Sequence, residues 1–353
     1  MRIAFIVTIR KRTGPVVVVS NLVEALLREH PDIRIKVFYF DESDENIFPA
    51  SVPTERIGLS SKMDFGQYDI VHTHMLRPDL YMLRHFLAWR KTPCRWVSTI
   101  HQQTFSNQRR RLGLAMSLVL TPIWYFAWLF CSRICCVGKT IQKEHPYRRS
   151  LVIYNGVPEI AAGPENGDLT QLLRSLRDKG RKIAVGCSNV VRLKGIEQTV
   201  NALVGLPEYD YVHFGEGEEM DGLKALAERL GVADRCHFVG QVCNPAQYYH
   251  LCDLFLMTSR SEGCCQAGLE ANAAGMPLVC SSIPQFTEIY DGIAEFFALD
   301  DVNGLVDAVR RAYGNREPSA KLSRRLYESQ FSSLTMARNY YAVYSDLARK
   351  EHR

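Results

Sequence analysis

The sequence predicts an α/β protein made of two parallel-sheet domains, on the basis of three observations. Short segments rich in β-branched and aromatic residues alternate with helical segments, and this alternation occurs twice along the chain. Such alternation is typical of parallel sheets covered by helices. A stretch rich in glycine, proline and acidic residues, 155–168, separates the two halves, and a length of 353 residues suits two domains.

The N-terminal half is expected to form a domain over residues 1–157 and to begin with a strand. The first apolar run, "RIAFIV", is too short for a signal peptide and lacks a small-residue cleavage site. A helix is expected over 16–30. The strands expected in this half cover 2–7, 34–40, 69–74, 95–100 and 133–138.

The C-terminal half repeats the pattern. Residues 158–180 are expected to hold the linker and a first helix, and residues 181–330 a second domain. The last segment, 331–353, contains an amphipathic helix that we expect to cross back to the N-terminal domain or to bridge both domains. The strands expected in this half cover 182–188, 209–214, 235–240, 253–257 and 277–281, and the helices 195–206, 220–231 and 265–275.

The composition excludes several classes of protein. With 46% hydrophobic and 23% charged residues, the chain is globular rather than disordered. A net charge of +5 is too small to indicate nucleic acid, but it suits an anionic ligand or an acidic membrane surface. The 11 cysteines are odd in number and lack the paired spacing of a zinc site, so we expect reduced thiols in a cytoplasmic protein.

One segment, Arg109–Cys131, does not fit a plain globular domain. Three arginines begin it, and 20 residues without a charge follow. That length could span a bilayer, but Pro122 divides the segment and both of its flanks are basic. Trp124 and Trp128 are typical of a membrane interface. Contact with the inner face of the cytoplasmic membrane, a buried helix pair and a spanning helix are the three alternatives.

Two cations come together where a predicted strand ends. In "VRLKGIEQ", Arg192 and Lys194 follow the strand 182–188 and precede a helix, and Gly195 lets the backbone approach a ligand. Two cations beside free helix N–H groups form an anion site, most naturally for a diphosphate. The alternative is a solvated basic turn. Gly215, in the exit loop of the next strand, is weak evidence by itself.

Two carboxylates, Glu262 and Glu270, flank the start of the helix that follows the strand 253–257. Eight helical residues would separate them by about 12 Å along the axis. The paired carboxylates of glycosidases lie roughly 5–10 Å apart, so we expect separate roles here, one at a reacting sugar and one at a diol such as a ribose. A Glu262 that caps the helix dipole and a solvated Glu270 form the alternative.

Together these residues resemble a retaining glycosyltransferase of family 4, whose GT-B fold has two facing Rossmann-like domains. The most specific part is E-x7-E from Glu262 to Glu270, followed by "ANAAGMPLVCSSIPQFTEIYDG" with Glu288. "KGIEQTVNAL", "YVHFGEGEE", "HFVGQV" and "IYNGV" also occur in the family's order. In the N-terminal half, "TGPVVVVSNLVEALL" and "STIHQ" resemble the family's glycine loop and strand-end histidine.

The resemblance implies four catalytic residues. Arg192 and Lys194 would hold the donor diphosphate and stabilise the charge that builds on it as it leaves. Glu262, with the backbone after it, would contact the donor sugar. His101 would reach that sugar from the opposite domain.

The resemblance also implies a set of donor-binding residues. Glu270 would bind the ribose hydroxyls, and Gly14 would let the first helix approach the phosphates. The loop at Gln241 and Val242 would meet the base. The full set implied in donor binding is Gly14, Gly215, Gln241, Val242, Gly263, Cys264, Cys265 and Glu270.

The activity that the resemblance implies is transfer of a sugar from a UDP or GDP donor to a cell-surface glycan. The acceptor would be a lipid-linked oligosaccharide or a precursor of lipopolysaccharide or capsule. Neither a metal nor another cofactor is expected, and no nucleic acid partner. A nucleotide-sugar epimerase of the same fold and a non-catalytic nucleotide-sugar-binding protein are the alternatives. His72 and His74, at the end of the strand 69–74, are either acceptor contacts or structural histidines.

Overall fold

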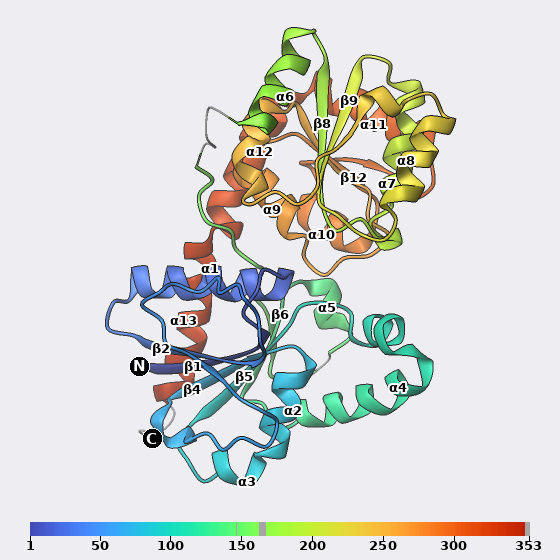
Figure 1. Cartoon of the computed structure of the whole chain (residues 1–353). Helices are drawn as coiled ribbons and strands as arrows, with labels where there is room; N and C mark the ends of the chain where they lie inside the picture. The colour runs from blue at the N-terminus through green and yellow to red at the C-terminus, as the bar shows by residue number, and fades with distance from the viewer. Residues whose placement is uncertain (146, 162–166, 350–353) are drawn as a thin grey trace. The chain divides into compact units, whose positions relative to one another are not determined.

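In the computed structural model the chain forms two compact units (Figure 1). Unit 1 comprises Met1–Pro158 and Ser332–Arg353, and unit 2 comprises Glu159–Phe331. The structure describes residues 1–145, 147–161 and 167–349, with their side chains except those of residues 106, 107 and 111. Residues 162–166 of the predicted linker therefore lie outside the described residues, as does the side chain of Arg111 in the basic flank of the apolar segment.

Unit 1 contains a seven-stranded sheet in the order β3-β2-β1-β4-β5-β6-β7, and all of its pairings are parallel. Five of these strands lie where the sequence predicts them. The two edge strands, β3 and β7, were not predicted, because three residues are too few to show a period of two. The strands are β1 (Arg2–Ile9), β2 (Arg34–Asp41), β3 (Thr54–Arg56), β4 (Ile70–His74), β5 (Arg95–Ile100), β6 (Arg133–Cys136) and β7 (Ser150–Val152).

The C-terminal helix belongs to unit 1, although unit 2 precedes it in the chain. This helix, α13, lies beside α1 (Figure 1), and its Tyr340 and Tyr344 are buried in the same apolar core as the valines of α1. The predicted crossing of the last segment to the N-terminal domain is thereby confirmed. The helices of unit 1 are α1 (Gly14–Glu29), α2 (Leu76–Arg84), α3 (Phe86–Trp89), α4 (Thr104–Trp128), α5 (Lys139–Lys143) and α13 (Ser333–Arg349).

Unit 2 contains a six-stranded parallel sheet in the order β10-β9-β8-β11-β12-β13. The chain builds outward from β8 to one edge and then from β11 to the other, so the order reverses between these two strands. In open parallel sheets, ligands bind beyond the carboxyl ends of the strands at such a reversal. The strands are β8 (Lys182–Cys187), β9 (Tyr209–Phe214), β10 (Cys236–Phe238), β11 (Leu254–Met257), β12 (Leu278–Ser281) and β13 (Glu295–Phe297).

Helices cover both faces of this second sheet (Figure 1). The helices predicted over 195–206, 220–231 and 265–275 are present, and the first of them ends in a 3-10 turn. Two parallel sheets with helical crossovers confirm the predicted α/β class. The helices of unit 2 are α6 (Asp168–Asp178), α7 (Ile196–Ala202), α8 (Met220–Arg229), α9 (Gln266–Ala273), α10 (Pro284–Tyr290), α11 (Val302–Gly314) and α12 (Arg316–Leu326).

The apolar segment forms most of α4, which is bent at Gly113, where φ is 81°. Trp124 and Trp128 are buried and donate their indole N–H groups to the carboxylate of Asp79, at 2.6 and 2.8 Å. The expectation that these tryptophans lie at a membrane interface is therefore wrong, because a buried carboxylate attracts both indoles inward. Among the described residues, no helix combines the length and apolarity needed to cross a bilayer.

Candidate functional site

The reversal point of unit 2 holds two of the residues that the sequence singles out. Lys194 follows β8, and Glu262 follows β11. Both line a small cavity of about 20 Å³ at the ends of these strands, together with Ser188, Thr258 and Cys265. The topology therefore brings together two motifs that are 68 residues apart.

Lys194 and Glu262 form an ion pair whose Nζ–Oε1 distance is 2.5 Å. The Lys194 side chain is 21% exposed and that of Glu262 is 11% exposed. Ser259 donates a second hydrogen bond, of 2.6 Å, to the same Glu262 oxygen. Burial lowers the pKa of Lys194, but Glu262, Cys265 and Cys187 together more than offset this effect, so the pKa of Lys194 lies above its ordinary value. The site thus keeps a cation that is permanently charged at neutral pH.

The turn that carries Lys194 is a 3-10 turn, Arg192–Lys194, which ends at Gly195 with φ 62°. A Cβ at position 195 would collide with the carbonyl oxygen of Thr258, so the turn and the β11 exit approach as closely as backbones can. Arg192 lies at the same turn but is exposed. Within the described part of the chain, its guanidinium has no ion-pair partner.

Glycine also lets the β9 exit loop approach β8. Gly215 has φ 134°, its N–H donates to the carbonyl of Gly240 at 2.8 Å, and a Cβ there would collide with the Ser188 carbonyl. Gln241 and Val242 follow that carbonyl, and the Gln241 N–H approaches Glu216 at 3.4 Å. The structure therefore places the loop predicted to meet a base beside the exit of β8 and β9.

The carboxylates of Glu262 and Glu270 both raise the pKa of the Cys265 thiol. Cys265 is the N-cap of α9, and burial, reinforced by Glu262, raises its pKa to about 12. Glu270 lies in α9 and also raises the pKa of Cys187 at the end of β8, after the effect of burial. Gly263 and Cys264 complete the loop and are partly exposed. Both carboxylates therefore lie close enough to Cys265 to act electrostatically on its thiol.

Unit 1 has an order reversal of its own, between β1 and β4, and two predicted residues lie near it. Gly14 begins α1 just after β1, and an added Cβ there would have no atom within 4 Å. His101 follows β5 and is 8% exposed; its Nε2 lies 2.8 Å from Nδ1 of His74. Burial lowers the pKa of His101 to about 4, so the imidazole is neutral at pH 7.

His72 and His74, the two candidate acceptor contacts at the end of β4, differ in their surroundings. His72 is structural: its ring nitrogens lie 2.7 Å from Thr99 Oγ1 and 2.7 Å from Tyr344 Oη. His74 is buried, and its Nε2 has no partner among the described residues. Met75 follows with φ 80°, a strained conformation for a residue other than glycine and one that is enriched at functional sites.

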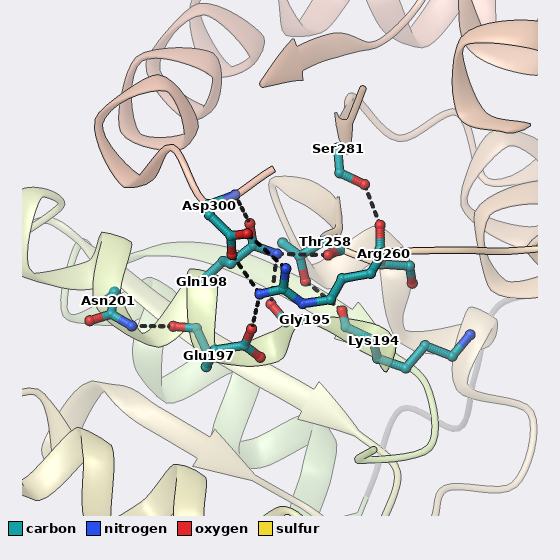
Figure 2. A network of polar contacts seen from close by, with 10 residues as sticks. Lys194, Gly195, Glu197, Gln198, Asn201, Thr258, Arg260, Ser281 and Asp300 are labelled. Atoms are coloured by element: carbon teal, nitrogen blue, oxygen red, sulfur yellow. Dashed lines mark hydrogen bonds and ion pairs between the residues drawn. The ribbon is translucent and has the colours of Figure 1, made fainter. Parts of the chain in front are cut away.

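Sequence reasoning missed Arg260, two residues before Glu262. Its guanidinium joins two acidic residues, Glu197 in the first turn of α7 and Asp300 in the loop before α11 (Figure 2). Its position in "TSRSEG" was the only available signal, because the partners lie 63 and 40 residues away.

Two family models match the chain, one in each half. Residues 172–329 match the model described as glycosyl transferases group 1. Residues 6–159 match the model described as Glycosyltransferase Family 4. The two matches together include the β1–α1 loop, His101, the Lys194 turn and both carboxylates.

Individual proteins are similar as well. The chain is 28% identical over 356 residues to the O-antigen biosynthesis glycosyltransferase WclY of Escherichia coli, with 99% of each chain covered. It is 31% identical over 199 residues to the lipopolysaccharide core biosynthesis mannosyltransferase LpsB of Rhizobium meliloti, covering 52% of this chain and 57% of that one. The crystal structure of Anabaena Alr3699/HepE in complex with UDP and glucose superposes with a TM-score of 0.77 at 18% identity, covering 98% of this chain and 100% of that one.

Proposed function

The chain belongs to glycosyltransferase family 4, and we propose that it transfers a sugar, with retention, from a UDP- or GDP-sugar to a glycan acceptor. The proposed acceptor is a lipid-linked oligosaccharide or a precursor of lipopolysaccharide or capsule. The names of WclY and LpsB, which refer to O-antigen and lipopolysaccharide core biosynthesis, support this acceptor class.

The observation that carries the proposal is the Lys194–Glu262 pair at the reversal point of unit 2. Departure of a nucleoside diphosphate builds negative charge, and a preorganised cation stabilises that charge. Lys194 is such a cation, and exposed Arg192 at the same turn would supply a second. Glu262 would then accept a hydrogen bond from a hydroxyl of the donor sugar. Glu270 would accept hydrogen bonds from the ribose hydroxyls. The proposal requires no bound metal.

Titration calorimetry with UDP and GDP tests the donor site. Lys194→Met should weaken binding of the preferred nucleotide at least tenfold, because a hydrogen bond to a charged group contributes roughly 1.5–3 kcal/mol. Lys182→Met is the matched control, since Lys182 lies at the opposite, amino end of β8 and pairs with Glu208 at 3.7 Å. Equal affinity of the wild type and Lys194→Met would place the diphosphate elsewhere.

We further propose that α4 docks on the inner face of the cytoplasmic membrane. Its outward side carries large apolar residues and no acidic residue, and Arg109 and Arg110 lie exposed at its start. Exposed apolar surface of this extent marks an interaction site, and the adjacent cations favour anionic lipid. The exposed apolar residues of α4 are Phe105, Leu112, Leu114, Met116, Leu118, Val119, Ile123 and Phe126, with Leu129 just beyond it.

The neighbouring helix extends this surface. Phe86 of α3 contacts Phe130, just after α4, with ring centroids 4.6 Å apart, and Leu87 beside it is 73% exposed. Arg90 and Lys91 follow, both exposed. The apolar surface therefore has cations at both ends, the arrangement that suits an anionic bilayer.

Sedimentation with phosphatidylglycerol vesicles tests this docking. Leu118→Glu and Phe126→Glu should each reduce the bound fraction, and Val204→Glu should not, although Val204 in unit 2 is equally exposed. Sedimentation velocity without lipid tests whether a second copy of the chain, rather than a membrane, covers this surface. A dimer in the wild type that these variants dissociate, with vesicle binding unchanged, would make α4 an interface between copies and refute the membrane proposal.

A further inference from the structure

Arg260 connects three loops at the carboxyl edge of the unit 2 sheet (Figure 2). Its Nη2 lies 2.7 Å from Oε1 of Glu197, at the start of α7, and its two terminal nitrogens lie 2.5 and 2.8 Å from the carboxylate of Asp300, before α11. Its backbone N–H donates to the carbonyl of Leu193 at 2.8 Å. Arg260, which belongs to the β11 exit loop, thus binds the Lys194 turn, the start of α7 and the β13 exit loop.

A second layer of hydrogen bonds connects the same loops (Figure 2). The Gln198 amide donates to the Thr258 carbonyl at 2.9 Å and accepts the Asp300 N–H at 2.8 Å. The Thr258 hydroxyl donates to the Lys194 carbonyl at 2.9 Å. Asp300 has φ 66°, a strained conformation for a residue other than glycine, and its contacts with Arg260 and Gln198 hold it there.

The direct connection between the Lys194 turn and the Glu262 loop differs from the connections through Arg260 and Gln198. It runs through the side chains of Lys194 and Glu262, and it uses the ammonium that a diphosphate would need. When the ammonium turns to a diphosphate, this connection weakens. The connection through Arg260 uses no group that the donor would contact, so it persists.

We propose that Arg260 is a positioning residue that keeps the Lys194 turn and the Glu262 loop in register while Lys194 binds the donor diphosphate. This inference rests on the proposed donor site. Arg260 does not contact the donor; it acts through the backbone of Leu193 and through Glu197. The planar guanidinium fork suits this task because it holds two carboxylates at once, which a lysine cannot do in the same geometry.

A purely structural role makes a different prediction. The Arg260 side chain is 31% exposed and its partners are 36% and 65% exposed, and ion pairs of this kind contribute little to stability. A structural role therefore predicts a small change in stability and no selective change in ligand affinity. A positioning role predicts a loss confined to ligands that carry the second phosphate.

Calorimetry with the preferred nucleoside diphosphate and its monophosphate separates these roles. We expect Arg260→Met to weaken diphosphate binding about tenfold, since misplaced binding groups lose much of their effect, while monophosphate binding changes less than about threefold. Arg260→Lys should also weaken diphosphate binding more than monophosphate binding, with a smaller loss of affinity. Arg311→Met is the matched control, because Arg311 pairs with Glu295 at 2.7 Å in the same unit, and it should leave both affinities unchanged.

The outcomes are distinct. Unchanged diphosphate affinity in folded Arg260→Met, or an equal loss for both ligands, would overturn the positioning role and leave the donor site intact. If Arg260→Met does not fold, unchanged affinities in Arg260→Lys would overturn it equally. A wild type that binds neither UDP nor GDP would overturn the proposed donor site, and the positioning role with it.

Discussion

Replacing Asp79 by asparagine should leave unit 1 at least as stable at pH 7 as in the wild-type protein. The buried carboxylate accepts hydrogen bonds from Trp124, Trp128 and Ser98 on Oδ2, and one from Thr73 on Oδ1. In the asparagine variant the amide oxygen can take the place of Oδ2. The amide nitrogen can donate to the Thr73 hydroxyl, which then donates to the Val97 carbonyl at 3.2 Å. The second amide N–H has no partner in this arrangement, and leaving it buried costs about 1–3 kcal/mol.

The magnitude follows from the burial of the charge. Burial raises the pKa of Asp79 from 3.8 to about 6, even though four hydrogen bonds oppose the shift. A difference of this size corresponds to about 3 kcal/mol. After the cost of the unpaired amide N–H is subtracted, we expect a gain between zero and about 2 kcal/mol at pH 7. Asp79→Ala should instead destabilise, because each buried indole N–H that loses its acceptor costs about 1–3 kcal/mol.

The effect of pH has a definite sign. The folded-state pKa of Asp79 is raised, so its contribution is fully present below about 3.8 and is lost as pH rises through about 6. The advantage of Asp79→Asn should therefore shrink between pH 7 and pH 5, where wild-type Asp79 is itself largely protonated. The buried histidines also make stability depend on pH, with the opposite sign. Their contribution is the same in both proteins, so it cancels when the stability of the wild type is subtracted from that of the variant.

Urea denaturation followed by tryptophan fluorescence measures this difference. All four tryptophans lie in unit 1, so the signal reports that unit alone. Asp69→Asn is the control, because Asp69 pairs with Arg2 at the surface and is 34% exposed. A loss of more than about 1 kcal/mol in Asp79→Asn at pH 7 would refute the reasoning, since the charge would then be stabilising in the folded state.

Three further predictions concern other parts of the chain. Gly195→Ala should destabilise unit 2 by roughly 2–4 kcal/mol, because alanine would have to adopt a left-handed conformation and its Cβ would collide with the Thr258 carbonyl. Circular dichroism during urea denaturation measures this loss, and a value below about 1 kcal/mol contradicts the prediction. Burial lowers the pKa of His101, so unit 1 should lose stability as pH falls below the ordinary histidine value of about 6.5, and His101→Gln should reduce that loss in tryptophan-detected denaturation. Cys265, whose pKa is raised to about 12, should react far more slowly with iodoacetamide than exposed Cys243 by mass spectrometry, and equal rates would show that its loop is open.

Much of the fold followed from local pattern. Buried parallel strands are nearly continuous apolar runs, so 2–7, 34–40 and 209–214 were recognisable without their partners. The order of strands and helices then limited the topology to two parallel sheets. The pair Glu262 and Lys194 was also accessible, because each follows a predicted strand, and the carboxyl ends of parallel strands share one edge.

Tertiary structure decided what no single segment encodes. The inward orientation of Trp124 and Trp128 depends on Asp79, which is 45 and 49 residues away, and hydropathy cannot reveal a distant buried acceptor. The role of Arg260 likewise depends on Glu197 and Asp300, which only the folded sheet brings beside it. Local periodicity determines which elements form and which side of each is apolar. The pairing of polar groups is set by through-space distances, which exist only after the chain has folded.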